Sequence, residues 1–125
     1  MRAKFAYTGI RVSSMDESIS FYTDVMGMKL VRRFKIGETK GEIATLSSEE
    51  DEILELNWYD RESQFYSDYV AGEALDHLAF RVDSLEAAVN EAESKGYPVK
   101  AEIRAGNSRW CYIQDPNGIW IELFE

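Results

Sequence analysis

The chain has a single histidine and a single cysteine, and both scarcities limit its chemistry. One cysteine, Cys111, excludes an internal disulfide and fits a reducing compartment. Because one protomer offers one imidazole, three-histidine zinc sites and two-histidine, one-carboxylate iron sites are excluded within a chain. A metal site here would have to be rich in carboxylates, which suit octahedral divalent ions.

Basic residues, proline and long apolar runs are also scarce. The 14 Lys and Arg residues against 23 Asp and Glu give a net charge of −9, which argues against binding to nucleic acid or anionic membranes. No apolar run approaches the roughly 18 residues of a membrane span, and no apolar segment follows residues 1–5 as a secretory signal requires. We therefore expect a cytoplasmic protein with one domain over residues 1–125.

What the sequence does contain is an internal repeat. The stretch that begins at Tyr7 matches one that begins at His77, 70 residues later, and the stretch around Glu55 matches the one around Glu122, 67 residues later. A repeated segment usually marks one structural unit used twice. Two facing copies would bring an imidazole, two carboxylates and a phenol together.

Each half reads as a strand, a helix and three further strands. The first strands alternate in polarity with a period of two. The helices begin at capping-box patterns, Ser14 with Glu17 and Asp83 with Glu86, and glycines at 27 and 96 predict their ends. The other expected strands cover about 29–36, 42–46, 53–57, 99–104, 109–114 and 119–124, with a hairpin turn at 115–118.

These elements predict an α+β fold of two paired βαβββ modules, about 5–57 and 75–124. Their strands would form a curved, mixed eight-stranded sheet with the helices outside. The aromatic-rich connection over 58–76 has no clear period. It would be partly helical, cross to a partner chain, or simply pack over one end of the sheet.

A wider pattern is formed by five segments: 9–12, 21–28, 54–56, 76–80 and 115–123. Together they resemble the vicinal oxygen chelate superfamily, which includes glyoxalase I, methylmalonyl-CoA epimerase, extradiol dioxygenases and bleomycin-resistance proteins. The resemblance covers nearly the whole chain, its last segment is highly characteristic, and the nearest pattern is that of glyoxalase I (lactoylglutathione lyase).

The resemblance implies metal ligands at Glu55, His77 and Glu122. The family's first ligand, a histidine or glutamine, falls on Tyr7, which is a departure. A tyrosine can ligate as a phenolate or as a weak neutral donor, or it can donate a proton or hydrogen bond beside the metal. The implied cofactor is a divalent ion, Ni²⁺, Zn²⁺, Co²⁺, Mn²⁺ or Mg²⁺, and the alternative is that the metal has been lost.

The reaction implied is that of a metal-dependent lyase or isomerase of glyoxalase I type. It would transfer a proton at the carbon adjacent to a carbonyl in a small α-oxygenated substrate. The reaction would pass through a metal-chelated enediolate. Glu122, or Glu55 by pseudo-symmetry, would carry the proton, with Tyr7 as the third catalytic candidate.

Three residues are candidates for binding substrate: Arg11, Asn57 and Trp120. Arg11 matches an arginine that glyoxalase I uses near the glutathione carboxylates. The family's asparagine in that region is replaced by Tyr59, and Asn57 lies two positions earlier, so glutathione dependence stays open. Candidate wall residues of the site are Trp110, Tyr112, Trp120 and Phe124.

Two other functions are compatible with parts of the pattern. A non-catalytic, small-molecule-binding protein of the bleomycin-resistance type would keep the concave binding site of the curved sheet and lose the metal, and Tyr7 favours this alternative. An iron-dependent ring-cleaving dioxygenase is disfavoured by the single histidine. Relatives of this size also imply a homodimer, whose sites can lie within one chain or combine modules of two chains.

Overall fold

The computed structural model describes residues 1–114 and 119–125, and the turn predicted at 115–118 lies outside them. The chain divides into two compact units: an N-terminal unit, Tyr7–Asp76, and a C-terminal unit made of Met1–Ala6 with His77–Glu125. Strand β1, Ala3–Arg11, contributes residues to both.

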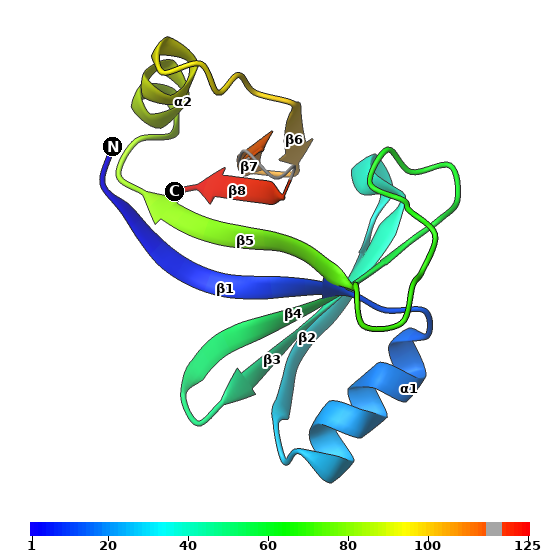
Figure 1. The fold of residues 1–125 in the computed structure, drawn as a ribbon. Helices are drawn as coiled ribbons and strands as arrows, with labels where there is room; N and C mark the ends of the chain where they lie inside the picture. The colour runs from blue at the N-terminus through cyan, green and yellow to red at the C-terminus, as the bar shows by residue number, and fades with distance from the viewer. Residues whose placement is uncertain (115–118) are drawn as a thin grey trace. The chain divides into compact units, whose positions relative to one another are not determined.

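The N-terminal unit places four strands beside one helix (Figure 1). Its strand order is β2-β3-β4-β1, in which β1 and β4 are parallel and the other pairs antiparallel. Helix α1 packs on one face of this sheet, and the buried core there comprises Val12, Met15, Ala44, Leu46 and Leu56. The elements after β1 are α1 (Met15–Ser20), the π-helical turn η1 (Phe21–Val25), β2 (Lys29–Ile36), the 3₁₀ turn η2 (Gly37–Thr39), β3 (Gly41–Ser48) and β4 (Asp51–Tyr59).

The C-terminal unit repeats this plan. Its strand order is β1-β5-β8-β7-β6, in which β5 and β8 are parallel. Helix α2 covers a core of Val82, Leu85, Ala88, Cys111 and Leu123. The elements are β5 (Leu75–Val82), α2 (Leu85–Ser94), β6 (Ala101–Ala105), β7 (Ser108–Gln114) and β8 (Trp120–Phe124).

The two units share their strand register as well as their element order. Glu55 on β4 pairs with Gly9 on β1, and Glu122 on β8 pairs with Ala79 on β5. Since Gly9 and Ala79 are themselves 70 residues apart, the repeat read from the sequence is a repeat of structure. The predicted α+β fold of two βαβββ modules with an eight-stranded mixed sheet is confirmed.

The helix ends confirm most of the predicted signals and correct one. Ser14 caps α1 by accepting a hydrogen bond from the backbone N–H of Glu17, as predicted. The cap of α2 is Ser84 and not Asp83, because Ser84 has the extended backbone of an N-cap and accepts from Ala87 N. The carboxylate of Asp83 instead binds Arg2. Glycines follow both helical segments with positive φ, at Gly27 (72°) and Gly96 (90°).

The aromatic-rich connection contains turns and no helix over the described residues 60–74, so the partly helical alternative is wrong. Phe65 is 3% exposed and packs against the ring of Tyr59 at 5.7 Å. Ser63 donates a hydrogen bond to the carbonyl of Thr39 at 2.6 Å. These contacts fold the connection back over the N-terminal unit. Among the described residues, no helix is long and apolar enough to cross a membrane.

Candidate functional site

In the C-terminal unit the structure brings His77 and Glu122 together. His77 lies near the start of β5 and Glu122 in the middle of the neighbouring parallel strand β8. The imidazole Nε2 and the carboxylate Oε2 are 3.3 Å apart. The residues are 1% and 8% exposed. Burying an imidazole and a carboxylate in an apolar core costs free energy. Such pairs occur at functional sites and also in structural networks.

Tyr112 and Trp110 extend this pair into a hydrogen-bonded chain. Tyr112 lies opposite Glu122 in the antiparallel β7–β8 register, and its hydroxyl is 3.0 Å from Oε2 of Glu122. The indole Nε1 of Trp110, two residues earlier on the same face of β7, lies 3.2 Å from the Tyr112 hydroxyl oxygen. The sequence singled out both residues only as candidate walls. The signal it offered was the period of two along β7, which alone does not give the cross-strand partner.

The aromatic candidates of the C-terminal unit have different surroundings. Trp120 is half-buried on β8, and its ring makes an edge contact with Tyr112 at 5.6 Å between centroids. Phe124 lies under the guanidinium of Arg81, 4.7 Å from the ring centre. Trp120 therefore borders the His77–Glu122 pair through Tyr112.

In the N-terminal unit, the polar face of the sheet carries Glu55 and Tyr7, which the internal repeat relates to Glu122 and His77. Glu55 is 8% exposed and Asn57 is 1% exposed, two residues apart on β4 and therefore on one face. Thr45 on β3 pairs with Glu55 and is also buried. Tyr7 is half-buried on β1. This face of the unit is polar, in contrast to the apolar face beneath α1.

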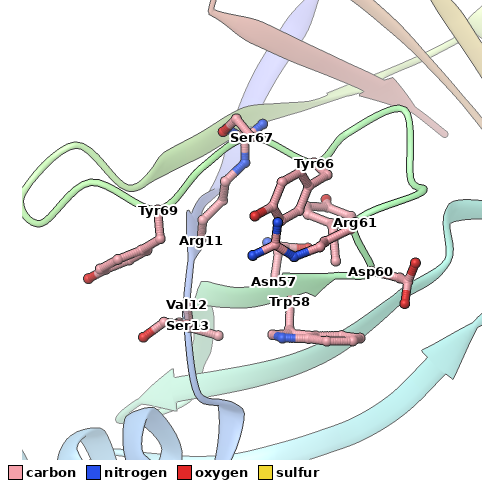
Figure 2. A pocket seen from close by; sticks show the side chains of 11 residues that line it. Arg11, Val12, Ser13, Asn57, Trp58, Asp60, Arg61, Tyr66, Ser67 and Tyr69 are labelled. Atoms are coloured by element: carbon pink, nitrogen blue, oxygen red, sulfur yellow. The ribbon is translucent and has the colours of Figure 1, made fainter.

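A cavity of about 270 Å³ opens at the end of this polar face (Figure 2). Two predicted substrate-binding residues, Arg11 and Asn57, line it together, whereas Trp120 belongs to the other unit. Among the described residues, none accepts a hydrogen bond from the buried amide Nδ2 of Asn57. The remaining lining comes mainly from the end of β4 and the connection after it: Trp58, Tyr59, Asp60, Arg61, Tyr66, Ser67 and Tyr69.

Arg11 is held in this cavity by partners that the sequence did not reveal. Its Nε donates to Asp76 at 2.7 Å, and Nη1 donates to the Ser67 hydroxyl. The hydroxyl of Tyr59 donates to the other oxygen of Asp76 at 2.8 Å. Burial, and then the charge of Asp76, raises the pKa of Tyr59 well above its ordinary value, so this phenol stays protonated and donating.

The connection adds a second arginine to the cavity. The guanidinium of Arg61 lies over the ring of Tyr66, 5.8 Å from its centre, a contact visible in Figure 2. Arg61 was not among the predicted residues, and a lone arginine in an aperiodic segment gives no sequence signal. The cavity thus combines aromatic walls with cationic and amide donors.

Within the described part of the chain, no group of three or more histidine, cysteine, aspartate or glutamate side chains has the geometry of a metal cluster. The predicted set of Tyr7, Glu55, His77 and Glu122 draws on both units. Its convergence on one point stays a prediction.

Known proteins resemble this chain over nearly its full length. A probable lactoylglutathione lyase of Vibrio cholerae is 32% identical over 98% of this chain and 90% of that protein. The lactoylglutathione lyase of Schizosaccharomyces pombe is 31% identical over 96% of this chain, which spans about half (46%) of that enzyme. The crystal structure of methylmalonyl-CoA epimerase from Mycobacterium tuberculosis superposes with a TM-score of 0.82 at 27% identity, over 97% of this chain and 86% of that one.

The family comparison agrees with these relatives, which are enzymes by name. The match to the Glyoxalase/Bleomycin resistance protein/Dioxygenase superfamily runs over residues 4–123 and so includes β1 through most of β8. Together with the shared βαβββ plan and the identity to lactoylglutathione lyases, this match places the chain: it belongs to the Glyoxalase/Bleomycin resistance protein/Dioxygenase superfamily.

Proposed function

We propose that this chain is a metal-dependent lyase or isomerase of the glyoxalase I type, which moves a proton next to a carbonyl of a small α-oxygenated substrate. The observation that carries the proposal is the buried His77–Glu122 pair, at two of the positions where the family pattern implies ligands. The names of the relatives, lactoylglutathione lyases at 31–32% identity, support the reaction type.

The donor chemistry fits a divalent cation. Ligand nitrogen and oxygen atoms lie about 2.0–2.2 Å from such an ion, so two ligands of one ion lie about 3 Å apart. The 3.3 Å between Nε2 of His77 and Oε2 of Glu122 suits this arrangement. In the proposal His77, Glu122 and Glu55 hold the ion, and Tyr7 is a fourth ligand or a donor beside it. The ion, when bound, acts as a Lewis acid on the substrate oxygens.

The protein's own side chains would do the proton chemistry and hold the substrate. A carboxylate oxygen, of Glu122 or of Glu55, would take the proton from the hydroxyl-bearing carbon and deliver it to the neighbouring carbonyl carbon. The hydroxyl proton would pass to the former carbonyl oxygen, so that substrate and product are isomers. Tyr112 and Trp120 shield Glu122 from bulk water, because they pack against each other beside it. Arg11 and Asn57 would contact polar groups of the substrate from their shared cavity.

A second reaction of the same chemical type is epimerisation of an acyl-CoA. The observation that favours it is the superposition on methylmalonyl-CoA epimerase with a TM-score of 0.82. Both reactions remove and return a proton next to a carbonyl, so the same carboxylates would serve either. Tyr59 replaces the glyoxalase asparagine and donates its hydroxyl proton to Asp76 in a hydrogen bond. This replacement is compatible with a substrate other than a glutathione adduct.

The test is a paired assay of the purified chain, loaded separately with Ni²⁺, Zn²⁺, Co²⁺, Mn²⁺ and Mg²⁺. One arm follows thioester formation from methylglyoxal and glutathione, and the other follows deuterium exchange at the α-carbon of methylmalonyl-CoA. We expect turnover in one arm that is lost after chelation and restored by metal. If the substrates bind without turnover under every metal, the non-catalytic binding protein is the correct description.

The role of Tyr7 is decided by Tyr7→Phe in the same assay. A fall in metal content would make Tyr7 a ligand, because the phenylalanine ring cannot coordinate. A fall in rate with unchanged metal content would make it a proton or hydrogen-bond donor.

A further inference from the structure

Tyr112 occupies a special position relative to the proposed ligand Glu122. It is 6% exposed, pairs with Glu122 across β7 and β8, and brings its hydroxyl within 3.0 Å of Oε2. The same oxygen faces Nε2 of His77 at 3.3 Å. The phenol of Tyr112 and the imidazole of His77 therefore both lie next to the same carboxylate oxygen, Oε2 of Glu122.

The direction of the hydrogen bonds follows from the chemistry of the donors. The indole N–H of Trp110 can only donate, so the Tyr112 oxygen at 3.2 Å accepts from it. With its oxygen engaged in this way, the Tyr112 hydroxyl directs its own proton toward Glu122, which can accept as a carboxylate. Trp110 thus donates a hydrogen bond to Tyr112, and Tyr112 donates one to Oε2 of Glu122.

The other unit offers an internal comparison. Thr45 stands in the same register position toward Glu55 as Tyr112 does toward Glu122. The Thr45 hydroxyl is buried and, among the described residues, has no hydrogen-bond partner. The repeat has therefore kept a hydroxyl at both positions, and only the tyrosine is long enough to bind its cross-strand glutamate.

We propose that Tyr112 is a positioning residue for Glu122: supported by Trp110, it fixes the carboxylate in the orientation that presents Oε2 together with Nε2 of His77. This inference rests on the proposed function, in which those two atoms share a divalent cation. Side chains that hold a ligating group by a hydrogen bond act on metal affinity, and their loss typically weakens binding about 10–100-fold.

The experiment is a Co²⁺ titration of the full chain, followed by calorimetry and by the visible absorption of the bound ion. Tyr112→Phe removes only the hydroxyl, and we expect Co²⁺ to bind about 10–100-fold more weakly with an altered absorption band. Trp110→Phe removes the donor to Tyr112 and should cause a smaller loss. Thr45→Val removes the counterpart hydroxyl and should leave Co²⁺ affinity unchanged.

Each outcome bears on the proposal. Equal Co²⁺ affinity and an equal spectrum in Tyr112→Phe and the unaltered chain would overturn the positioning role while leaving the proposed function standing. An unaltered chain that binds none of the five ions would overturn both. If Tyr112→Phe does not fold, Trp110→Phe decides, and an unchanged affinity in that variant would overturn the inference. An equal loss in Thr45→Val would also overturn it, because the effect would then not depend on the bond to Glu122.

Discussion

At the scale of single residues, the feature that dominates is a carboxylate set among aromatic rings. Glu122 is 8% exposed and accepts a hydrogen bond from Tyr112, which in turn contacts the rings of Trp120 and His77. A charged group in such surroundings needs partners, and these partners fix its orientation. These contacts hold the Glu122 side chain in one orientation and leave little of it exposed.

Glu122→Gln tests that chemistry directly. The amide keeps the shape and removes the base and a negative charge, so we expect kcat to fall by about 10²–10⁴ if Glu122 carries the proton. Steady-state kinetics on the metal-loaded chain gives the ratio, and Glu55→Gln gives the same measurement for its counterpart. Glu62→Gln, at an exposed glutamate, is the matched control and should leave kcat unchanged. If Glu55→Gln loses kcat and Glu122→Gln keeps it, the base is Glu55.

Tyr59 makes the stability of the folded protein depend on pH in the alkaline range. Its pKa is raised above the ordinary 10.0, first by burial and then by the charge of Asp76. Above pH 10 the unfolded chain therefore releases this proton while the folded chain retains it. Since the unfolded state then binds fewer protons, stability falls with rising pH, by at most about 1.4 kcal/mol per pH unit from this group.

Urea unfolding between pH 9 and pH 11 measures this slope. In Tyr59→Phe the loss of stability with pH should be smaller, although the variant starts lower at neutral pH because Asp76 loses a donor. Tyr97→Phe, at a tyrosine 42% exposed, should keep the slope of the unaltered chain. Equal slopes in all three proteins would contradict the assignment to Tyr59.

At the scale of elements, the pairing of β3 with β4 depends on one glycine, Gly41, at the start of β3. A Cβ on Gly41 would lie 2.9 Å from the carbonyl oxygen of Trp58 and 2.9 Å from Cδ1 of Tyr59. Both belong to β4, which pairs with β3 at this point. The strand pair can therefore close beside the cavity only if position 41 has no side chain.

Gly41→Ala should lower the free energy of unfolding by about 1–3 kcal/mol, because β4 has to move away from β3. Gly37→Ala is the matched control, since a Cβ there meets nothing within 4 Å, and its effect should be small. Chemical denaturation of the two variants and the unaltered chain compares them. A larger loss in Gly37→Ala than in Gly41→Ala would refute this account of the β3–β4 pairing.

At the scale of the whole molecule, three exposed apolar side chains lie in η1 and at the residue that follows it. Phe21 is 47% exposed, Val25 69% and Met26 59%. Apolar patches of this kind usually mark an interface. The family resemblance and this patch together favour a homodimer.

Light scattering after size-exclusion chromatography tests the assembly. We expect a mass about twice the 14.4 kDa of one chain, and Val25→Glu should shift the protein to monomer, because a charge would be buried in the interface. Tyr97→Glu, at another exposed apolar position, should leave the dimer intact. A monomeric mass for the unaltered chain would contradict the prediction.

Much of the fold was determined by the sequence alone, because its signals are local. The period of two along β1 and β5, the helix caps and the glycines after each helix depend on neighbours a few residues away. The offset between Tyr7 and His77 then related the two halves. The one-residue error at the second cap arose because Asp83, with Glu86 three residues later, matches the capping box, which Ser84 with Ala87 does not. The carboxylate of Asp83 binds the distant Arg2.

The tertiary structure decided what the candidate residues touch. The bonds from Tyr112 to Glu122 and from Arg11 to Asp76 join residues 10 and 65 positions apart. Both depend on which residues stand opposite each other across strands and on how the connection folds back. The internal repeat made a histidine and two glutamates candidates, and the family resemblance added Arg11. Only the register could give each its partner, since hydrogen bonds depend on distances of about 3 Å that no local pattern encodes.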